Sequence, residues 1–543
     1  MLSLLKNTGE IPVEIEEGNT EYKLKIKSFN LNDDSDNIRF KKLTSQLSWR
    51  LNEGKQLYSK NIATYILGIT NDGKMGKVNE EIINESIKSL DLIAKSCHSQ
   101  ITNITKEYFD TKYCVAQIII QKYNDIFIKE IRVCFFGNIN SGKTTMISHL
   151  CSGHKDNGNG SGRSTIMRHV HEQISGSTSS ICHELIGYNG LNLINYKTSK
   201  FGSWEKIVNH SDFIVSLIDL PGSQKYIRTT IYGLLSRRPH LSFLTIAIKD
   251  CYGDDGQFTI NNNLIELFKL LHYYGTKIII IFTKNDWMNN DYSFLIEFKK
   301  ILIKNINISN ISLVEFDNNI DILDNNIIPY ILISNITGEG YDNIHQLFNT
   351  CIENKLYNSH DTQYDNSNIK FLFGEIYSQC NEFISNEKII IASGLLVSGI
   401  INVGDILNVG PYNNKFYPII VKNIHKKQID CKTFNTHEYG SLEIEFIDEI
   451  VPLDNHMILV NMNSIINLVN TCKIKIYHGL EYIKIKKSYS LHSDNIVESC
   501  SIIEINNDII TVKFNRLPDI QICIFSGNKC ILKCENYLFG LIL

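Results

Sequence analysis

The chain has 543 residues, a formal net charge of −4, and 43% hydrophobic against 21% charged residues. This length predicts three or four domains, and the balance of apolar and charged residues excludes a disordered chain. The charge excludes a chain-wide basic field for nucleic acid, so any RNA contact would have to use local patches.

The sequence shows no sign of membrane insertion or of an oxidising compartment. The start, Met1–Lys6, lacks the long apolar core of a signal peptide, and the longest apolar runs, such as Ile278–Phe282, are too short to span a bilayer. The fourteen cysteines form no C-x-x-C pair, and we expect most of them to be buried thiols. We therefore expect a soluble, cytoplasmic protein without membrane contact.

Residues 1–130 are predicted to form a small α/β domain without a catalytic signature of its own. Its first helix is predicted from four apolar side chains at helical spacing: Phe40, Leu43, Leu47 and Leu51. Gly54 is expected to end that helix. A second helix is expected over about 80–95, with Asn79 as its cap, and a strand over Cys114–Gln121.

Residues 131–357 alternate short apolar runs with helical patterns. Five runs are expected to be buried parallel strands: Ile131–Phe136, Phe213–Ile218, Leu241–Ile248, Lys277–Phe282 and Tyr330–Ile333. A helix with apolar side chains from Leu264 to Tyr274 is expected to end at Gly275. The alternation predicts a doubly wound α/β sheet, with ligand loops at the carboxyl ends of its strands.

The C-terminal third of the chain is predicted to be almost entirely β. It follows the polar stretch Asn358–Asn368, which is a candidate linker. Short strands separated by Gly and Asn-Asn turns predict two small β-barrels, over residues 369–450 and 451–543, with a join near Val451.

The first strand of the α/β region leads into the pattern G-x-x-x-x-G-K-S/T. Its residues are Gly137, Asn138, Ile139, Asn140, Ser141, Gly142, Lys143, Thr144 and Thr145. The preceding strand and a helix expected over Thr144–Leu150 give the context of a phosphate-binding loop, in which backbone N–H groups and the helix N-terminus face anionic oxygens. Lys143 is expected to reach the β- and γ-phosphates, and the Thr144 hydroxyl to hold Mg²⁺.

A second strand is followed by a D-x-x-G motif. Its residues are Asp219, Leu220, Pro221 and Gly222. Asp219 is expected to hold Mg²⁺ through water, and the Gly222 N–H to contact the γ-phosphate. Thr178, in the small-residue loop Ser175–Ser180, is a candidate for a further Mg²⁺ ligand that also contacts the γ-phosphate. The alternative for Thr178 is a mobile polar loop without such a role.

Two later motifs predict guanine as the base. Thr283, Lys284, Asn285 and Asp286 fit N/T-K-x-D, while Ser334, Asn335 and Ile336 follow the last strand. The carboxylate of Asp286 can accept two hydrogen bonds from guanine that adenine does not offer, and the alkyl stem of Lys284 would lie along the base. The segment from Ser334 would close the O6 side. Together the motifs favour GTP and GDP over adenine nucleotides.

With these motifs in place, the chain resembles the translational GTPase superfamily, typified by elongation factor Tu. Within it, the chain is most similar to the eukaryotic GTP-binding protein 1 and 2 branch. The likeness extends to four further segments: Arg168–Ser180, Asp219–Tyr226, Leu47–Gly54 and Ser393–Asp405. The resemblance implies an α/β P-loop GTPase domain, two β-barrels, hydrolysis of GTP to GDP, and engagement of the ribosome or tRNA.

The chain also departs from the family pattern. Elongation factors carry a His after D-x-x-G that positions the attacking water, and this position is Ser223, followed by Gln224. Asn140 stands where elongation factors carry Asp, and Thr283 in place of the commoner Asn loses an amide tether. Lys143, Thr178 and Gly222 therefore remain the candidates to support hydrolysis. Two interpretations stay open, a slow or partner-activated GTPase and a GTP-dependent binding switch with negligible hydrolysis.

Other sites are less favoured by the sequence. His169 and His171 could form a metal pair, but surface or loop-packing histidines are the commoner case. Lys426-Lys427 and the group Lys484, Lys486 and Lys487 are candidate RNA patches, for which solvated surface lysines are the favoured alternative.

Overall fold

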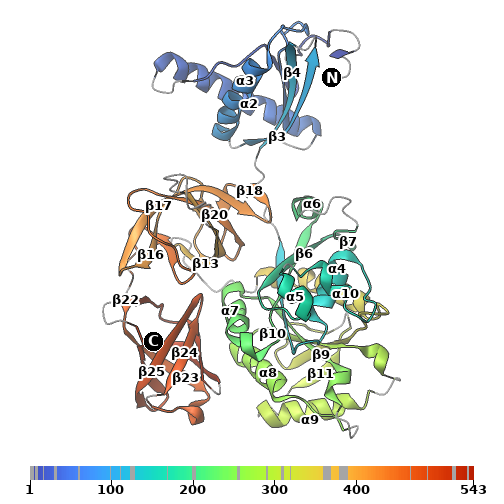
Figure 1. Ribbon diagram of the computed structural model, residues 1–543, viewed down its shortest axis with the longest axis vertical. Coiled ribbons are helices and arrows are strands. Elements are labelled where there is room, and N and C mark those ends of the chain that lie inside the picture. The colour runs from blue at the N-terminus through green and yellow to red at the C-terminus, as the bar shows by residue number, and fades with distance from the viewer. Residues whose placement is uncertain are drawn as a thin grey trace. The chain divides into compact units, whose positions relative to one another are not determined.

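The computed structural model comprises two compact units, Met1–Ile126 and Phe127–Leu543 (Figure 1). It describes all residues except 1–4, 7–9, 16, 30–32, 59–61, 98, 110–111, 123–128, 168, 198–203, 253–256, 289–291, 307–310, 318–319, 359–367, 378–388, 465, 467, 486, 517–520 and 535–536. Most of the candidate linker, together with Arg168 and Lys486, thus lies outside the described residues.

The first unit contains a four-stranded sheet with the order β1-β2-β4-β3. The elements are β1 (Thr20–Lys23), α2 (Asp34–Tyr58), β2 (Ile62–Leu67), α3 (Glu80–Ser96), β3 (Ser99–Phe109) and β4 (Tyr113–Lys122). Both helices pack on one face of the sheet, where alternate side chains of β2 and β4 share a hydrophobic core with Leu47 and Leu90. The predicted cap of α3 is confirmed, because Asn79 Oδ1 accepts a hydrogen bond of 3.1 Å from the N–H of Ile82.

The first helix does not end at Gly54, as the sequence led us to expect, but continues to Tyr58. A Cβ at Gly54 would lie 2.0 Å from the carbonyl oxygen of Ile62. This glycine therefore permits close packing of the helix against β2, and it is not a terminator.

The second unit begins with an eight-stranded sheet whose order among the described residues is β11-β12-β10-β9-β5-β8-β6-β7. Its strands are β5 (Glu130–Phe136), β6 (Cys182–Asn189), β7 (Asn192–Ile194), β8 (Phe213–Asp219), β9 (Leu241–Ala247), β10 (Lys277–Thr283), β11 (Ser312–Glu315) and β12 (Ile327–Leu332). The five expected parallel strands are present, and all seven residues of β5, of β8 and of β9 are buried. The sequence analysis did not predict β6, β7 and β11, which extend the two edges of the sheet.

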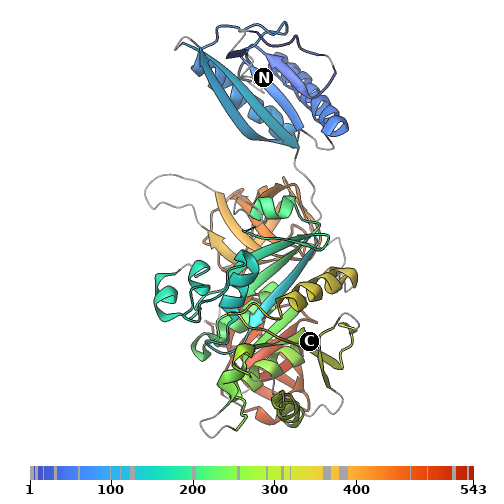
Figure 2. The same cartoon turned by 90° about the vertical axis from the view of Figure 1, so that its right-hand side faces the viewer.

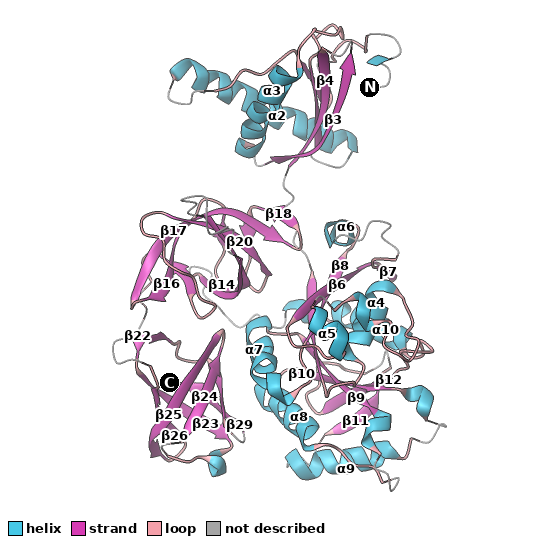
Figure 3. Cartoon of the chain, in the orientation of Figure 1, coloured by secondary structure: helices cyan, strands magenta, loops and turns pink. Residues whose placement is uncertain are grey.

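Helices cover both faces of this sheet (Figure 3). They are α4 (Lys143–Ser152), α5 (Val170–Ser175), α6 (Trp204–Asn209), α7 (Ile227–Arg237), α8 (Asn262–Tyr274), α9 (Phe294–Ile306) and α10 (Tyr341–Glu353). One core is built from α7, α8 and α9, and the other from α4 and α10. The α8 helix ends at Gly275, whose φ of 83° is the left-handed cap that the sequence predicted.

Two groups of strands follow, coloured orange and red in Figures 1 and 2. The first closes through β13 (Lys370–Tyr377), β14 (Ile389–Ser398), β20 (Tyr439–Phe446), β17 (Lys415–Lys426), β16 (Ile406–Tyr412) and β21 (Ile458–Asn461). Three short strands accompany it, β15 (Ile401–Asn402), β18 (Ile429–Cys431) and β19 (Thr433–Phe434). Because β21 pairs with β13 and β16, the first barrel extends beyond the expected join near Val451.

The second barrel is closed by β23 (Thr471–His478), β26 (Ile509–Phe514), β25 (Ile496–Asn506), β24 (Ser488–Ser493), β28 (Lys529–Lys533) and β29 (Tyr537–Ile542). Two short strands, β22 (Leu468–Val469) and β27 (Ile522–Cys523), pair with each other. In the chain, β22 precedes the barrel and β27 lies between β26 and β28. The described cysteines are free thiols, and most are buried, as expected. In the described part of the chain, no helix has both the length and the apolar character needed to cross a membrane.

Buried charges connect the barrels to the α/β domain. Asp494 of the second barrel accepts hydrogen bonds of 2.7 Å from Arg238, at the end of α7, and from Lys370 of the first barrel. Lys427 of the first barrel lies 2.7 Å from Glu130 at the start of β5. The α/β domain and the barrels of this unit are therefore joined by ion pairs in which the carboxylates are buried and the cations are buried or partly buried.

Candidate nucleotide-binding site

The phosphate loop lies between β5 and α4 and is folded tightly around Lys143. Gly137 and Gly142 have φ of 144° and 91°, and a Cβ at Gly137 would lie 2.2 Å from the carbonyl oxygen of Thr245. Only glycine fits there. Lys143 Nζ donates to the carbonyl oxygens of Gly137 and Asn138 at 3.0 and 2.8 Å. The loop thus holds the ammonium at the floor of a cavity.

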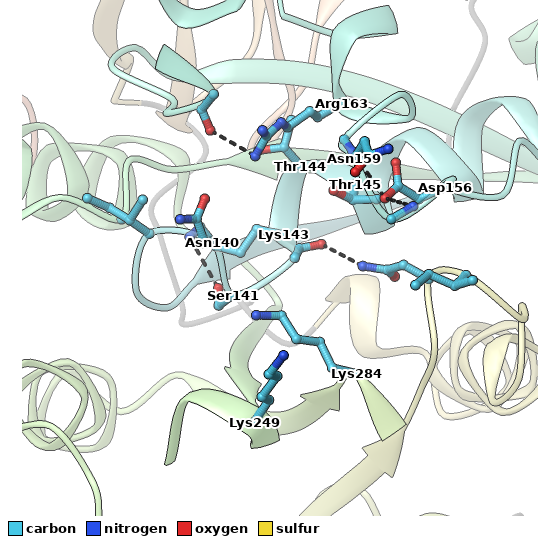
Figure 4. Close-up of a pocket in the computed structure, with 18 of the residues that line it drawn as sticks. Asn140, Ser141, Lys143, Thr144, Thr145, Asp156, Asn159, Arg163, Lys249 and Lys284 are labelled. Carbon is cyan, nitrogen blue, oxygen red and sulfur yellow. Dashed lines mark hydrogen bonds between the residues drawn. The ribbon is translucent and has the colours of Figure 1, made fainter. Parts of the chain in front are cut away.

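This cavity has a volume of about 650 Å³ (Figure 4). The predicted residues that line it are Ile139, Asn140, Ser141, Gly142, Lys143, Thr144, Thr145, Thr178, Gly222, Lys284, Asp286, Asn335 and Ile336. Residues from five separate parts of the chain, the four motifs and the segment that carries Thr178, therefore meet at one cavity. Eight other predicted residues do not line the cavity: Gly137, Asn138, Asp219, Leu220, Pro221, Thr283, Asn285 and Ser334.

Three oxygen-bearing side chains predicted to hold Mg²⁺ converge beside the loop. The Oγ1 atoms of Thr144 and Thr178 lie 2.6 and 3.0 Å from Asp219 Oδ2, and 3.0 Å from each other. No described donor bonds the other carboxylate oxygen, Asp219 Oδ1, although it is buried. Two hydroxyl oxygens and a carboxylate with one unpartnered oxygen are hard donors of the kind that Mg²⁺ binds.

Burial perturbs both charged groups of this cluster. It raises the pKa of Asp219, against the opposing effect of the Lys143 charge and the two threonine hydrogen bonds. It also lowers the pKa of Lys143 to about 8, although the Asp219 charge opposes that change. A polyanion with a divalent cation would relieve both costs, because each buried charge would gain a partner.

The base-binding motifs are tied to the phosphate loop. Thr283 Oγ1 donates to the carbonyl oxygen of Ser141 at 2.7 Å, and Asn335 Nδ2 donates to that of Gly142 at 3.3 Å. Thr283 has no side-chain amide, as expected, but its hydroxyl supplies a tether to the loop in place of the amide. Ser334 Oγ donates to Asp286 Oδ1 at 2.5 Å, which fixes the carboxylate assigned to guanine.

Lys284 adopts the left-handed conformation, with φ of 62°. Its Nζ pairs with the exposed carboxylate of Asp250 at 3.0 Å, so the alkyl stem is fixed where it lines the cavity. Trp287, which is 44% exposed, also lines this end of the cavity and offers a flat apolar surface. Trp287 was not assigned from the sequence, although it follows directly after Asp286.

The two residues after D-x-x-G, Ser223 and Gln224, are bonded to neighbouring residues. Ser223 Oγ accepts a hydrogen bond from the N–H of Lys225 and caps a short 3₁₀ turn, Gln224–Tyr226. Gln224 Nε2 donates to Asn263 Oδ1 at 2.5 Å, and Asn263 in turn donates to Asn138 Oδ1 at 2.7 Å. Ser223 and Gln224 do not line this cavity, but both line a neighbouring cavity of about 600 Å³ that shares Ile139, Ser141 and Gly222 with it.

A buried carboxylate organises the segment that carries Thr178. Glu172 Oε1 accepts from the N–H and hydroxyl of Ser179, both at 2.7 Å, and from those of Ser180 at 3.1 and 3.2 Å. Burial opposes ionisation, but these hydrogen bonds lower the pKa of Glu172 overall. His171 joins the same group through Ser179 and stacks on His169. No group of three or more metal-binding side chains is found in the described ranges.

For Lys426 and Lys427, both the candidate RNA patch and the favoured alternative of solvated surface lysines are wrong. Lys426 and Lys427 are only 3% and 6% exposed, since Lys426 pairs with Glu438 and Lys427 with Glu130. Of the second candidate patch, Lys484 is exposed and Lys487 is half-buried.

The sequence analysis also missed part of the cavity wall. These residues are Asp156, Gly158, Asn159, Gly160, Arg163, Gly176, Ser177, Lys249 and Trp287. Three signals were present: the glycine-rich composition of residues 156–163, the small-residue loop that contains Gly176 and Ser177, and the place of Trp287 directly after Asp286.

Comparison with known proteins agrees with this geometry. Residues 129–355 match the family described as Elongation factor Tu GTP binding domain. GTP-binding protein 2 of Mus musculus is 34% identical over 248 residues, which cover 44% of this chain and 39% of that protein. GTP-binding protein 1 of Xenopus laevis is 24% identical over 519 residues, which cover 92% of this chain and 73% of that protein. The aligned part thus spans about two fifths of the length of GTP-binding protein 2.

Solved structures share the fold at low identity. The bacterial selenocysteine-specific elongation factor EF-Sec aligns with a TM-score of 0.52 and 17% identity, over 76% of this chain and 58% of that one. The GTPase-like domain of S. cerevisiae Ski7, bound to GDP and inorganic phosphate, aligns with a TM-score of 0.57 and 16% identity, over 76% and 97%. Residues 129–355 therefore match an elongation factor Tu-type GTP-binding domain, and the chain is similar to GTP-binding proteins 1 and 2.

Proposed function

We propose that the chain binds GTP together with Mg²⁺ and hydrolyses it to GDP and phosphate as a two-state switch. The supporting observation is the convergence of Thr144, Thr178 and Asp219, within 3.0 Å of one another, beside the buried ammonium of Lys143. This arrangement suits a triphosphate with its cation, and Asp286 suits guanine.

In this proposal, a water oxygen attacks the γ-phosphorus in line with the bond to the β–γ bridging oxygen. That bond breaks, its electron pair remains on GDP, and the proton of the water ends on the released phosphate. Lys143 and the backbone N–H groups of the loop stabilise the charge that develops on the phosphate oxygens. Bound Mg²⁺, held by Thr144, Thr178 and Asp219, would neutralise part of the charge of the triphosphate.

The same contacts provide the switch. Thr178 is on a segment held by Glu172, and Gly222 is at the end of β8 just before α7. Loss of the γ-phosphate would remove the contacts of both residues. Because α7 ends at Arg237 and Arg238, which pair with the barrel residues Glu375 and Asp494, we propose that the barrels respond to the nucleotide.

A second candidate is a GTP-dependent binding switch with negligible hydrolysis. The side chains of Ser223 and Gln224 are occupied by Lys225 and Asn263, and neither lines the cavity. Single-turnover cleavage of GTP by the purified protein, with and without ribosomes, separates the two candidates. Rates equal to the uncatalysed reaction under both conditions would leave only the binding switch.

We further propose a cytoplasmic setting in which the protein engages the ribosome or tRNA. The likeness to translation factors supports this, whereas the net charge of −4 does not. RNA binding that weakens with salt and is lost when Lys484 and Lys487 are replaced by Ala would support it. RNA affinity that is insensitive to salt and to both substitutions would count against it.

A further inference from the structure

Arg163 is a cation in the nucleotide cavity that none of the nucleotide-binding motifs includes. It begins a short 3₁₀ turn, Arg163–Thr165, and lines the cavity together with Thr144, Thr145 and Thr178. In Figure 4 it lies beside Thr144, while Lys249 and Lys284 lie on the other side of the phosphate loop. The cavity therefore has basic side chains around the loop as well as beneath it.

The backbone leaves a slot for the guanidinium. Gly160 and Gly176 have φ of 83° and 65°, and a Cβ at either position would lie 2.5 or 2.6 Å from the guanidinium nitrogens of Arg163. Arg163 Nη1 donates to the carbonyl oxygen of Gly176 at 3.4 Å. Any side chain in place of either glycine would displace the guanidinium, so the two chain segments are shaped around it.

An aspartate fixes the turn that delivers Arg163. Asp156 accepts hydrogen bonds from the N–H groups of Gly158, Gly160 and Gly162 at 3.0, 3.4 and 2.9 Å. The anchored turn places Gly162 against the first turn of α4, since a Cβ there would lie 3.3 Å from Thr145 Cγ2. The guanidinium is thus carried by a constrained loop.

Arg163 lies close to the residues that are expected to contact the phosphates. Its partner Gly176 is two residues before Thr178, which bonds Asp219, and its own loop packs on Thr145. It therefore lies between the N-terminal turn of α4 and the segment that senses the γ-phosphate. Among the described residues no carboxylate forms an ion pair with Arg163, so its charge faces the cavity with only a neutral carbonyl as partner.

We propose that Arg163 contacts the phosphates of bound GTP and stabilises the charge that develops during hydrolysis. This rests on the proposed GTPase function. As the bond from the γ-phosphorus to the β–γ bridging oxygen breaks, negative charge grows on that oxygen and leaves with GDP. A guanidinium has five N–H donors in a planar fork, which suits two phosphate oxygens at once. Arg163 is then a catalytic residue supplied by the chain itself, at a site that lacks a water-positioning histidine.

Substitution of Arg163 tests the proposal. We expect Arg163→Ala to lower the single-turnover rate of GTP cleavage by roughly 10²- to 10³-fold, while GDP affinity changes by less than about tenfold. Binding of GDP with aluminium fluoride, which imitates the transferring phosphoryl group, should be lost in this variant and kept in the wild type. Added guanidinium chloride at millimolar concentration should restore part of the cleavage rate to Arg163→Ala and leave the wild-type rate unchanged.

Two controls separate this role from a structural one. Arg516→Ala removes a guanidinium that pairs with Glu498 on the second barrel, and should change neither rate nor affinity. Arg163→Lys keeps the charge but not the fork, and should retain GDP affinity with a reduced rate. It also serves as the test if Arg163→Ala does not fold.

The possible outcomes distinguish failure of the Arg163 proposal from failure of the proposed GTPase function. Wild-type cleavage with an unchanged rate in Arg163→Ala would overturn the role of Arg163 and leave the GTPase function standing. Parallel loss of GDP affinity and rate in both Arg163 variants would assign the residue to ground-state binding, and would also overturn the proposal. Absence of cleavage by the wild type would instead refute the GTPase function on which the proposal rests.

Discussion

The buried ammonium of Lys143 should make nucleotide binding depend on pH. Lys143 is 6% exposed, and burial lowers its pKa from 10.5 to about 8 in the nucleotide-free protein. This difference corresponds to about 3 kcal/mol in the free energy of keeping the group charged. Phosphate oxygens next to Nζ would raise the pKa again, so that the complex keeps the proton that the free protein loses above pH 8.

The direction and size of the effect follow from this difference. Well below pH 8, Lys143 is protonated in both the free protein and the GDP complex, so the affinity for GDP does not change with pH. At pH 9, about nine tenths of the free protein has lost the proton, so binding requires its uptake and the affinity falls by about tenfold, or about 1.4 kcal/mol. Nucleotide-free protein should conversely gain stability as the pH rises from about 8 towards 10.5, because only the unfolded chain then holds the proton.

Calorimetric titration of GDP into the protein, in two buffers with different heats of ionisation, measures this directly. We expect uptake of about one proton per GDP at pH 9 and almost none at pH 7. Lys155→Met is the control, because Lys155 Nζ contacts the carbonyl oxygen of Thr337 at the surface and should leave the uptake unchanged. An affinity for GDP that is equal at pH 7 and pH 9, without proton uptake, would refute the reasoning.

Three further substitutions test the base site, the water site and the barrel junction. Asp286→Asn should shift preference from GTP to xanthosine triphosphate in competition binding, because the amide donates where the carboxylate accepted. Ser223→His should raise the single-turnover rate of GTP cleavage, because an imidazole can position the attacking water. Asp494→Asn should destabilise the protein in urea unfolding by about 3–5 kcal/mol, because it removes the buried carboxylate charge that pairs with the partly buried Arg238 and Lys370.

Each of these predictions has a control variant or a result that would contradict it. Unchanged GTP affinity in Asp286→Asn would show that the carboxylate does not face the base. Lys225→His places an imidazole two residues further on and should give no gain, so an equal gain there would argue against the Ser223 assignment. Asp508→Asn breaks a pair with the exposed Lys475 and should leave urea unfolding almost unchanged, in contrast to Asp494→Asn.

Much of the α/β domain was predictable because its signals are local. A buried parallel strand needs a continuous apolar run, and β8 and β10 provide one. The phosphate loop needs glycine where another backbone segment comes too close for a side chain. Position 137 is such a place, because a Cβ there would lie 2.2 Å from the carbonyl oxygen of Thr245. The edge strands β7 and β11 are short and half-exposed, so they carry no such run and were missed.

The sequence by itself determined which chemical groups are present and which motif follows each strand, and therefore the residues of the proposed guanine-nucleotide site. Only the tertiary structure decided which distant groups meet. Thr283 replaces an amide tether through its hydroxyl, Lys427 is buried on Glu130, and Arg163 is seated between two glycines of different loops. The physical reason is that a motif reports the conformation of adjacent residues, whereas a contact between remote residues depends on how whole elements pack.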